Sequence, residues 1–240
     1  MSNKTALIFG GSRGIGAACV QALAADGFDV AYTYVARPGD FPEQIGGRRC
    51  VGYAADIRDE AQVAQVFADV ARDFGDAPTC VVANAGINVP PGPLAQFDSD
   101  HFRSLVEINI VGAFNVLREA ARHVKDGGTI IALTTSLVRH AVPGIGPYSA
   151  TKAAVECLVR SLAKELAARN VHVNAVAPGP VDTDLFRSGK SAEAIQRSAA
   201  MSPFNRVGDP AEIAAVIAFL ASGKASWVHG QVIQPNGGLI

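Results

Sequence analysis

The chain has 240 residues, of which 49% are hydrophobic and 18% charged, and its formal net charge is −1. This composition supplies the apolar material for one large folded domain and excludes a disordered chain. Because the charge is near zero and no basic cluster occurs, nucleic acid and anionic membrane surfaces are not expected as partners.

The expected location is the cytoplasm. The first four residues lead directly into an apolar strand pattern, without the apolar stretch and cleavage site of a signal peptide. No apolar run approaches the roughly 20 residues that a membrane-spanning helix needs. The four cysteines lack the paired spacing of zinc or redox sites, so we expect reduced thiols.

Short apolar strand patterns alternate with longer helical patterns along the chain. The predicted strands cover residues 5–9, 30–34, 50–54, 79–83, 129–134, 171–177 and 232–234. The predicted helices cover residues 15–25, 60–74, 100–124, 148–169 and 210–221. Since such alternation is typical of βαβ units, it predicts an α/β, doubly wound Rossmann-type fold. We expect a single domain over residues 1–240, with a seven-stranded parallel sheet and helices on both faces.

The segment 178–207 interrupts this alternation with Gly, Pro, Ser and Asp and only a weak helical stretch at 191–201. Long loops in compact domains often act as lids over active sites. We therefore predict a substrate lid at 183–207. Its apolar residues favour an apolar or mixed substrate; they are Leu185, Phe186, Met201 and Phe204.

A glycine-rich turn, Gly10-Gly11-Ser12-Arg13-Gly14-Ile15-Gly16, follows the first predicted strand and opens the first helix. This is the position of a dinucleotide-binding turn, in which glycines let the backbone approach a pyrophosphate. The helix N-terminus offers unpaired N–H groups to the anion. A plain tight turn is the alternative for an isolated match.

Tyr148 and Lys152 are four residues apart and share one face of a predicted helix. A nearby ammonium stabilises a phenolate and lowers the phenol pKa from about 10, which would suit Tyr148 for general acid–base catalysis. Random placement gives about 0.1 Tyr-x-x-x-Lys matches in a chain of this composition. The pair therefore needs support from other motifs.

Further motifs follow the predicted strands in order. They are Asp56-Ile57, Asn84-Ala85-Gly86, Asn109 in the long helix, Ser136 and Pro178-Gly179-Pro180-Val181-Asp182-Thr183. With the glycine-rich turn and Tyr148/Lys152, the chain resembles the short-chain dehydrogenase/reductase family from about residue 4 to the C-terminus. Its pattern is closest to the 3-oxoacyl-acyl-carrier-protein reductase-like branch. Phe9 and Ala83 depart from it, standing where the family has threonine and asparagine.

The resemblance implies hydride transfer between a nicotinamide and a carbonyl or secondary alcohol. No metal site is expected, because the histidines do not cluster with Cys or carboxylates at ligand spacing. The catalytic set would be Asn109, Ser136, Tyr148 and Lys152. Tyr148 would be the proton donor, Ser136 would orient the substrate, Lys152 would hold the nicotinamide ribose and Asn109 would anchor a water chain. Two alternatives remain open: an NAD-dependent secondary alcohol dehydrogenase, and a catalytically silent nucleotide-sensing protein.

The resemblance also implies a homotetramer, with the helices 100–124 and 148–169 and the segment around Trp227 at its interfaces. The implied cofactor contacts are Gly10, Ser12, Arg13, Gly14, Ile15, Gly16, Arg37, Asp56, Ile57, Asn84, Ala85, Gly86, Tyr148, Lys152, Pro178, Gly179, Val181 and Thr183. Asp56 would accept a hydrogen bond from the adenine amino group, although a helix cap is the structural alternative.

The charge near the end of the second strand favours NADP(H) over NAD(H). An acid there would bind the ribose hydroxyls and repel a 2′-phosphate, but residues 32–37 contain none. Arg13 and Arg37 would instead give the phosphate charge-assisted hydrogen bonds. The alternative is that Arg37 is solvated and that Asp40 or Glu43 folds back toward the ribose.

Overall fold

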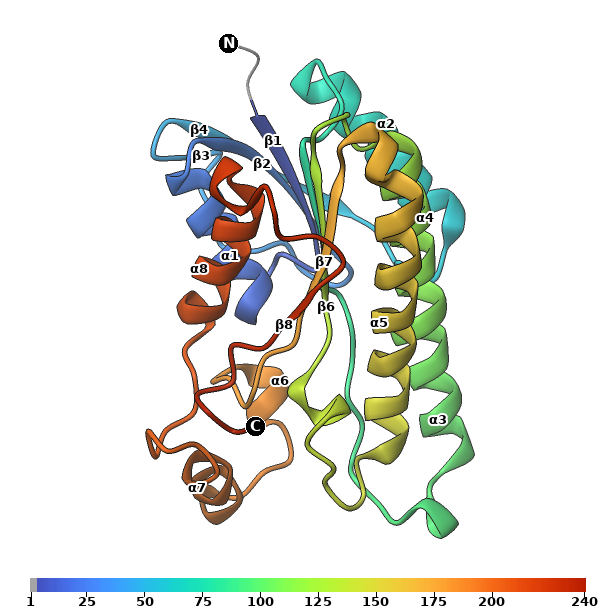
Figure 1. Cartoon of the computed structure of the whole chain (residues 1–240), viewed down its shortest axis with the longest axis vertical. Helices are drawn as coiled ribbons and strands as arrows, with labels where there is room; N and C mark the ends of the chain where they lie inside the picture. Colours follow the sequence, from blue (N-terminus) through green and yellow to red (C-terminus); the bar gives the residue numbers. More distant parts are fainter. Residues whose placement is uncertain (1–3) are drawn as a thin grey trace.

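An eight-stranded sheet forms the centre of the computed structural model, which describes residues 4–240 (Figure 1). The strands are β1 (Lys4–Phe9), β2 (Phe28–Tyr34), β3 (Gln44–Ile45), β4 (Arg48–Ala54), β5 (Cys80–Ala83), β6 (Thr129–Leu133), β7 (His172–Val176) and β8 (Val232–Ile233). Their order is β3-β4-β2-β1-β5-β6-β7-β8. The predicted doubly wound α/β fold is confirmed for residues 4–240, which are the described part of the expected domain 1–240.

All seven predicted strands form and pair in parallel, but the sheet has an eighth strand, β3, which the prediction missed. β3 pairs antiparallel with β4, with Ile45 opposite Arg48. Gly46 and Gly47 form the two-residue turn between them, at φ of 56° and 79°. Both central residues of such a hairpin turn need positive φ, which glycine adopts without strain. The Gly46-Gly47 pair between two short extended segments is the sequence signal that could have predicted this hairpin.

Helices cover both faces of the sheet, as predicted. They are α1 (Gly14–Ala25), α2 (Glu60–Phe74), α3 (Ser99–Val106), α4 (Ala113–His123), α5 (Gly146–Leu166), α6 (Asp184–Arg187), α7 (Ala192–Ala200) and α8 (Pro210–Ala221). Figure 1 shows α1 and α8 on one side of the sheet and α4 and α5 on the other. Strand residues alternate accordingly: Ile8 packs in the core cluster of α1 and α8, and its neighbour Leu7 in the cluster of α2, α4 and α5. Within residues 4–240, no helix has the length and apolarity to span a membrane.

The predicted helix 100–124 is not one regular α-helix. A π-helical segment, Glu107–Gly112, separates α3 from α4. Such segments insert an extra residue into a helical turn and often occur at functional sites. The helix predicted at 148–169 is α5, which continues as a 3₁₀ turn, Ala167–Arg169.

The site lies at the carboxyl ends of the strands. The chain order reverses between β1 and β5, which are neighbours in the centre of the sheet. Open α/β sheets bind ligands at such a switch point. Figure 1 shows α6 and α7, from the segment predicted as a lid, at this same end of the sheet.

Asp209 caps α8. Its carboxylate accepts a hydrogen bond from Ala211 N at 2.7 Å, and its own N–H donates to Glu212 Oε2 at 2.8 Å. We expect Asp209→Ala to lower the free energy of unfolding by about 1 kcal/mol, as loss of an N-cap usually does. Urea denaturation would measure this, with Asp209→Asn as the control that keeps a capping oxygen. An unchanged stability in Asp209→Ala would contradict the assignment.

Candidate active site

The glycine-rich turn is a close-packed piece of backbone at the end of β1. A Cβ added at Gly16 would lie 2.1 Å from the carbonyl oxygen of Gly10, and one at Gly10 would lie 2.9 Å from Cα of Ala85. No side chain fits in these spaces, so the glycines are required. Gly14, at φ of 54°, faces the methyl group of Thr183. The turn is thus shaped for a ligand that contacts backbone.

The side chains of Thr33 and Asn84 hold this turn, although Phe9 and Ala83 stand where the family has threonine and asparagine. Thr33 on β2 accepts hydrogen bonds from Gly10 N through its Oγ1 and from Gly11 N through its carbonyl, both at 3.0 Å. Asn84 Nδ2 donates to the carbonyl oxygen of Gly10 at 2.8 Å. The departures from the family pattern therefore leave the turn braced.

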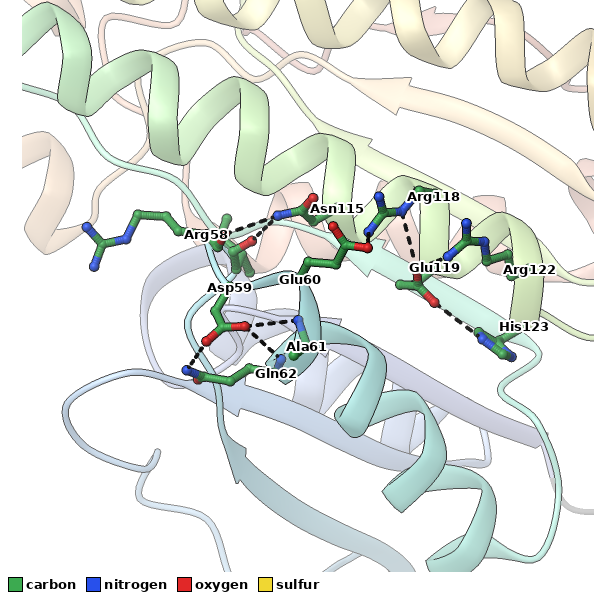
Figure 2. Close-up of polar contacts among 11 residues, drawn as sticks. Arg58, Asp59, Glu60, Ala61, Gln62, Asn115, Arg118, Glu119, Arg122 and His123 are labelled. Carbon is green, nitrogen blue, oxygen red and sulfur yellow. Dashed lines mark hydrogen bonds and ion pairs between the residues drawn. The ribbon is translucent and has the colours of Figure 1, made fainter.

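The Asp56-Ile57 loop is fixed from α4. Asn115 Nδ2 donates to the carbonyl oxygens of Ile57 and Arg58 at 3.0 and 3.3 Å (Figure 2). The Asp56 carboxylate accepts hydrogen bonds from the Arg58 side chain, which hold its pKa below the usual value. The cap of α2 is Asp59, whose carboxylate accepts from two backbone N–H groups. The helix-cap alternative for Asp56 is therefore wrong, and its contact with adenine stays a prediction.

Arg13 and Arg37 are both exposed, and neither forms an ion pair within residues 4–240. Arg13 lies at the start of α1 and makes no side-chain capping bond there. Arg37 lies in the loop after β2, and neither Asp40 nor Glu43 pairs with it. Both guanidinium groups are thus available to an anion.

Lys152 and Asn109 meet beside Gly86. Lys152 is buried, with 6% exposure, and its Nζ donates to the carbonyl oxygen of Leu133 at 3.1 Å. Asn109, in the π-helical segment, exchanges hydrogen bonds with the N–H and carbonyl of Ile87, each at 2.9 Å. A Cβ at Gly86 would lie 3.0 Å from Asn109 Oδ1 and 3.2 Å from Lys152 Nζ. Residues far apart in the sequence therefore meet at one point.

Thr151 joins Asn109 to the helix of Tyr148. Its Oγ1 accepts from Asn109 Nδ2 at 3.2 Å and donates to the carbonyl oxygen of Tyr148 at 2.7 Å. Asn109 itself lies in the π-helical segment between α3 and α4. Asn109 is thus connected through Thr151 to the backbone of Tyr148.

Ser136 opens a 3₁₀ turn after β6 and is fully buried. Its Oγ donates to the carbonyl oxygen of Ala177 at 2.8 Å, and its N–H donates to the carbonyl of Pro178 at 2.9 Å. The segment after β7 that contains Gly179 and Val181 is therefore tied to the Ser136 turn. For Ser136 to donate to a substrate, its hydroxyl must turn away from Ala177.

The expectation that Lys152 lowers the Tyr148 pKa is wrong for this structure. Loss of hydration raises the pKa of the Tyr148 phenol to about 12, although the residue as a whole is half-buried. Burial also lowers the pKa of Lys152 to about 8. Burial is the cause of both shifts, because desolvation disfavours the charged form of each group. Among residues 4–240, the Tyr148 hydroxyl makes no hydrogen bond, and it is not fully buried.

Sequence reasoning missed the residues that hold these groups. Thr33, Asn115 and Thr151 are buried polar residues, and each bonds to a predicted site segment. A polar residue on the apolar face of a helix or strand is the signal that finds them, because buried polar groups need partners.

Comparison with known proteins assigns the family. Residues 10–240 match the family described as enoyl-(acyl carrier protein) reductase. An NADPH-dependent aldehyde reductase-like protein of Arabidopsis thaliana, named as chloroplastic, is 38% identical over all of this chain and 95% of its own length. The 3-oxoacyl-[acyl-carrier-protein] reductase MabA of Mycobacterium tuberculosis is 36% identical over 99% of this chain and 93% of its own.

A solved structure agrees with these matches. The short chain dehydrogenase of Burkholderia cenocepacia in complex with NADP has a TM-score of 0.86 and 32% sequence identity, and the alignment covers 98% of this chain and 97% of that one. With the site geometry above, these similarities confirm the resemblance that the motifs indicated. The chain belongs to the short-chain dehydrogenase/reductase family of oxidoreductases.

Proposed function

We propose that this protein is an NADP(H)-dependent oxidoreductase that reduces a carbonyl group to a secondary alcohol and catalyses the reverse reaction. The observation that carries the proposal is the buried Lys152 amine, held by the Leu133 carbonyl beside Asn109 and four residues from Tyr148. Burying an amine is unfavourable and needs a compensating role. Packing alone does not require a buried amine at the carboxyl ends of these strands.

The proposed proton chemistry belongs to Tyr148. When bound, NADPH would supply the hydride, which leaves negative charge on the carbonyl oxygen of the substrate. A phenol with a pKa of about 12 keeps its proton until that charge develops. Ser136 would donate a second hydrogen bond to the same oxygen, and Lys152 would hold the nicotinamide ribose.

The cofactor cradle fits a dinucleotide along its length. The glycine-rich turn and the N-terminus of α1 suit the pyrophosphate, and the loop held by Asn115 suits the adenine. The exposed, unpaired Arg13 and Arg37 suit a 2′-phosphate. The NADPH-dependent relative and the NADP-bound structure support this choice over NAD(H).

The segment 183–207 is proposed as the substrate lid. It carries α6 and α7, and its apolar side chains include Phe204, which is 71% exposed, and Leu185, which is 44% exposed. Exposed apolar groups beside a catalytic site favour an apolar or mixed substrate. We also propose a homotetramer, supported by a Trp227 that is 98% exposed. The cytoplasmic location stays a prediction.

Tyr148→Phe tests the catalytic assignment. We expect this variant to fold and to bind NADPH within about twofold of the wild type, but to lose at least about 100-fold in kcat, since the proton donor is gone. Turnover of a panel of ketones and acyl thioesters would measure this. Tyr53→Phe is the matched control, because it removes a hydroxyl that, within residues 4–240, bonds to Asp73 alone. Near-normal turnover in Tyr148→Phe would refute the role.

The pH dependence should follow Lys152. Because its folded-state pKa is lowered to about 8, its charge is present at pH 7 and is lost as the pH rises through that value. We expect kcat/KM for reduction to be level near pH 7 and to fall about tenfold per pH unit well above pH 8. Tyr148, with a pKa of about 12, stays protonated over this range. A profile that remains level to about pH 10 would argue against the assignment.

Arg37→Ala tests the cofactor choice. By isothermal titration, the wild type should bind NADPH more tightly than NADH, and the variant should lose roughly 10-fold in affinity for NADPH alone, because a charge-assisted hydrogen bond is lost. Lys224→Ala, which removes an exposed positive charge after α8, is the control. Tighter binding of NADH by the wild type would overturn the NADP(H) assignment.

A further inference from the structure

We propose that Tyr32 and Phe41 are positioning residues for cofactor selectivity. Together they hold the loop 35–43, which carries Arg37, in a fixed place relative to the glycine-rich turn. We name this pair of side chains the aromatic bracket. The inference rests on the proposed use of NADP(H) and adds the part of the chain that would set the preference.

Tyr32 lies between the glycine-rich turn and β4. It is 5% exposed, and a Cβ added at Gly11 would lie 2.5 Å from its own Cβ. A Cβ at Gly52 would lie 2.7 Å from its ring carbon Cζ and from its hydroxyl. The ring therefore occupies the space that the two glycines leave. Tyr32 is in direct contact with the turn that suits the pyrophosphate.

The loop closes onto Tyr32 just after Arg37. The Phe41 ring meets the Tyr32 ring edge to face, with centroids 5.1 Å apart at 75°. Phe41 also covers Gly39, where an added Cβ would lie 2.3 Å from the ring. The Tyr32 hydroxyl donates to the carbonyl oxygen of Gly39 at 3.4 Å. Aromatic pairs of this geometry stabilise beyond the area they bury.

Within residues 4–240, the other hydrogen bonds that hold the loop lie at its ends. Its ends are fixed by hydrogen bonds from Ala55 N to the Tyr34 carbonyl at 2.9 Å and from Cys50 N to the Glu43 carbonyl at 2.8 Å. An open groove of about 690 Å³ runs between the loop and β4, lined in part by Tyr32, Tyr34, Phe41 and Cys50. Since the loop does not fill this space, the aromatic bracket is its main internal brace.

A braced loop changes affinity only for a ligand that the loop contacts. Ordering a free loop on binding costs conformational entropy, and a preorganised loop avoids that cost. Arg37 would contact the 2′-phosphate, which NADH lacks. Loss of the aromatic bracket should therefore weaken NADPH selectively, whereas general damage to the fold would weaken both nucleotides.

The experiment is isothermal titration of NADPH and NADH into the full chain. We expect Phe41→Ala to weaken NADPH binding by about 3- to 10-fold and NADH binding by less than about twofold, with a smaller shift of the same kind in Tyr32→Phe. In an Arg37→Ala background, Phe41→Ala should have almost no further effect on NADPH, because the two residues act through one contact. Tyr53→Phe, on the neighbouring strand β4, is the control and should leave the ratio unchanged.

Equal weakening of both nucleotides in Phe41→Ala, or full additivity with Arg37→Ala, would overturn the inference. If Phe41→Ala does not fold, Phe41→Leu and Tyr32→Phe provide the same comparison, and an unchanged NADPH to NADH ratio in both would overturn it too. A wild type that binds NADH more tightly, or neither nucleotide, would instead refute the proposed function and this inference with it. The wild-type titration thus separates the two failures.

Discussion

The arrangement of this site depends on keeping one amine buried. The pKa of Lys152 falls from 10.5 to about 8, which corresponds to about 3 kcal/mol of destabilisation of the charged form. Leu133 at the end of β6 supplies a carbonyl acceptor, and Asn109 Oδ1 lies on the same side of Gly86. Asn109 lies in the π-helical segment. The Leu133 carbonyl, the π-helical segment and the absent side chain at Gly86 thus all surround the buried amine of Lys152.

A second constraint, close approach of backbones, organises the cofactor end. Gly16 lies against the Gly10 carbonyl, and Gly10 lies against Ala85, so β1 and β5 end in turns that touch each other. At Gly11 and Gly52, by contrast, the space that a side chain would need is filled by Tyr32. The same residue type therefore serves two purposes. Some glycines allow backbone segments to approach each other closely, and others make room for an aromatic side chain.

Periodicity predicted the sheet, the flanking helices and the order of the site segments, because buried strands and amphipathic helices leave strong local patterns. It missed β3, whose two residues are too short for a pattern and depend on the Gly46-Gly47 turn. It missed the π-helical segment, because the polar Asn109 looks locally like any mid-helix residue. Motifs predicted which groups form the proposed site. They could not show that Thr151 and Asn115 hold them, since those bonds join segments distant in the chain.

The pKa values show why spacing alone gave the wrong sign for Tyr148. A Tyr-x-x-x-Lys pair in water would attract, and the phenol pKa would fall. Here burial raises the phenol pKa to about 12 and lowers the amine pKa to about 8, so at neutral pH the phenol keeps its proton and the amine is mostly charged. This is the protonation state that a reductase needs before hydride transfer. A proton donor must hold its proton until charge appears on the substrate oxygen, and a phenol whose pKa is raised by burial meets that requirement.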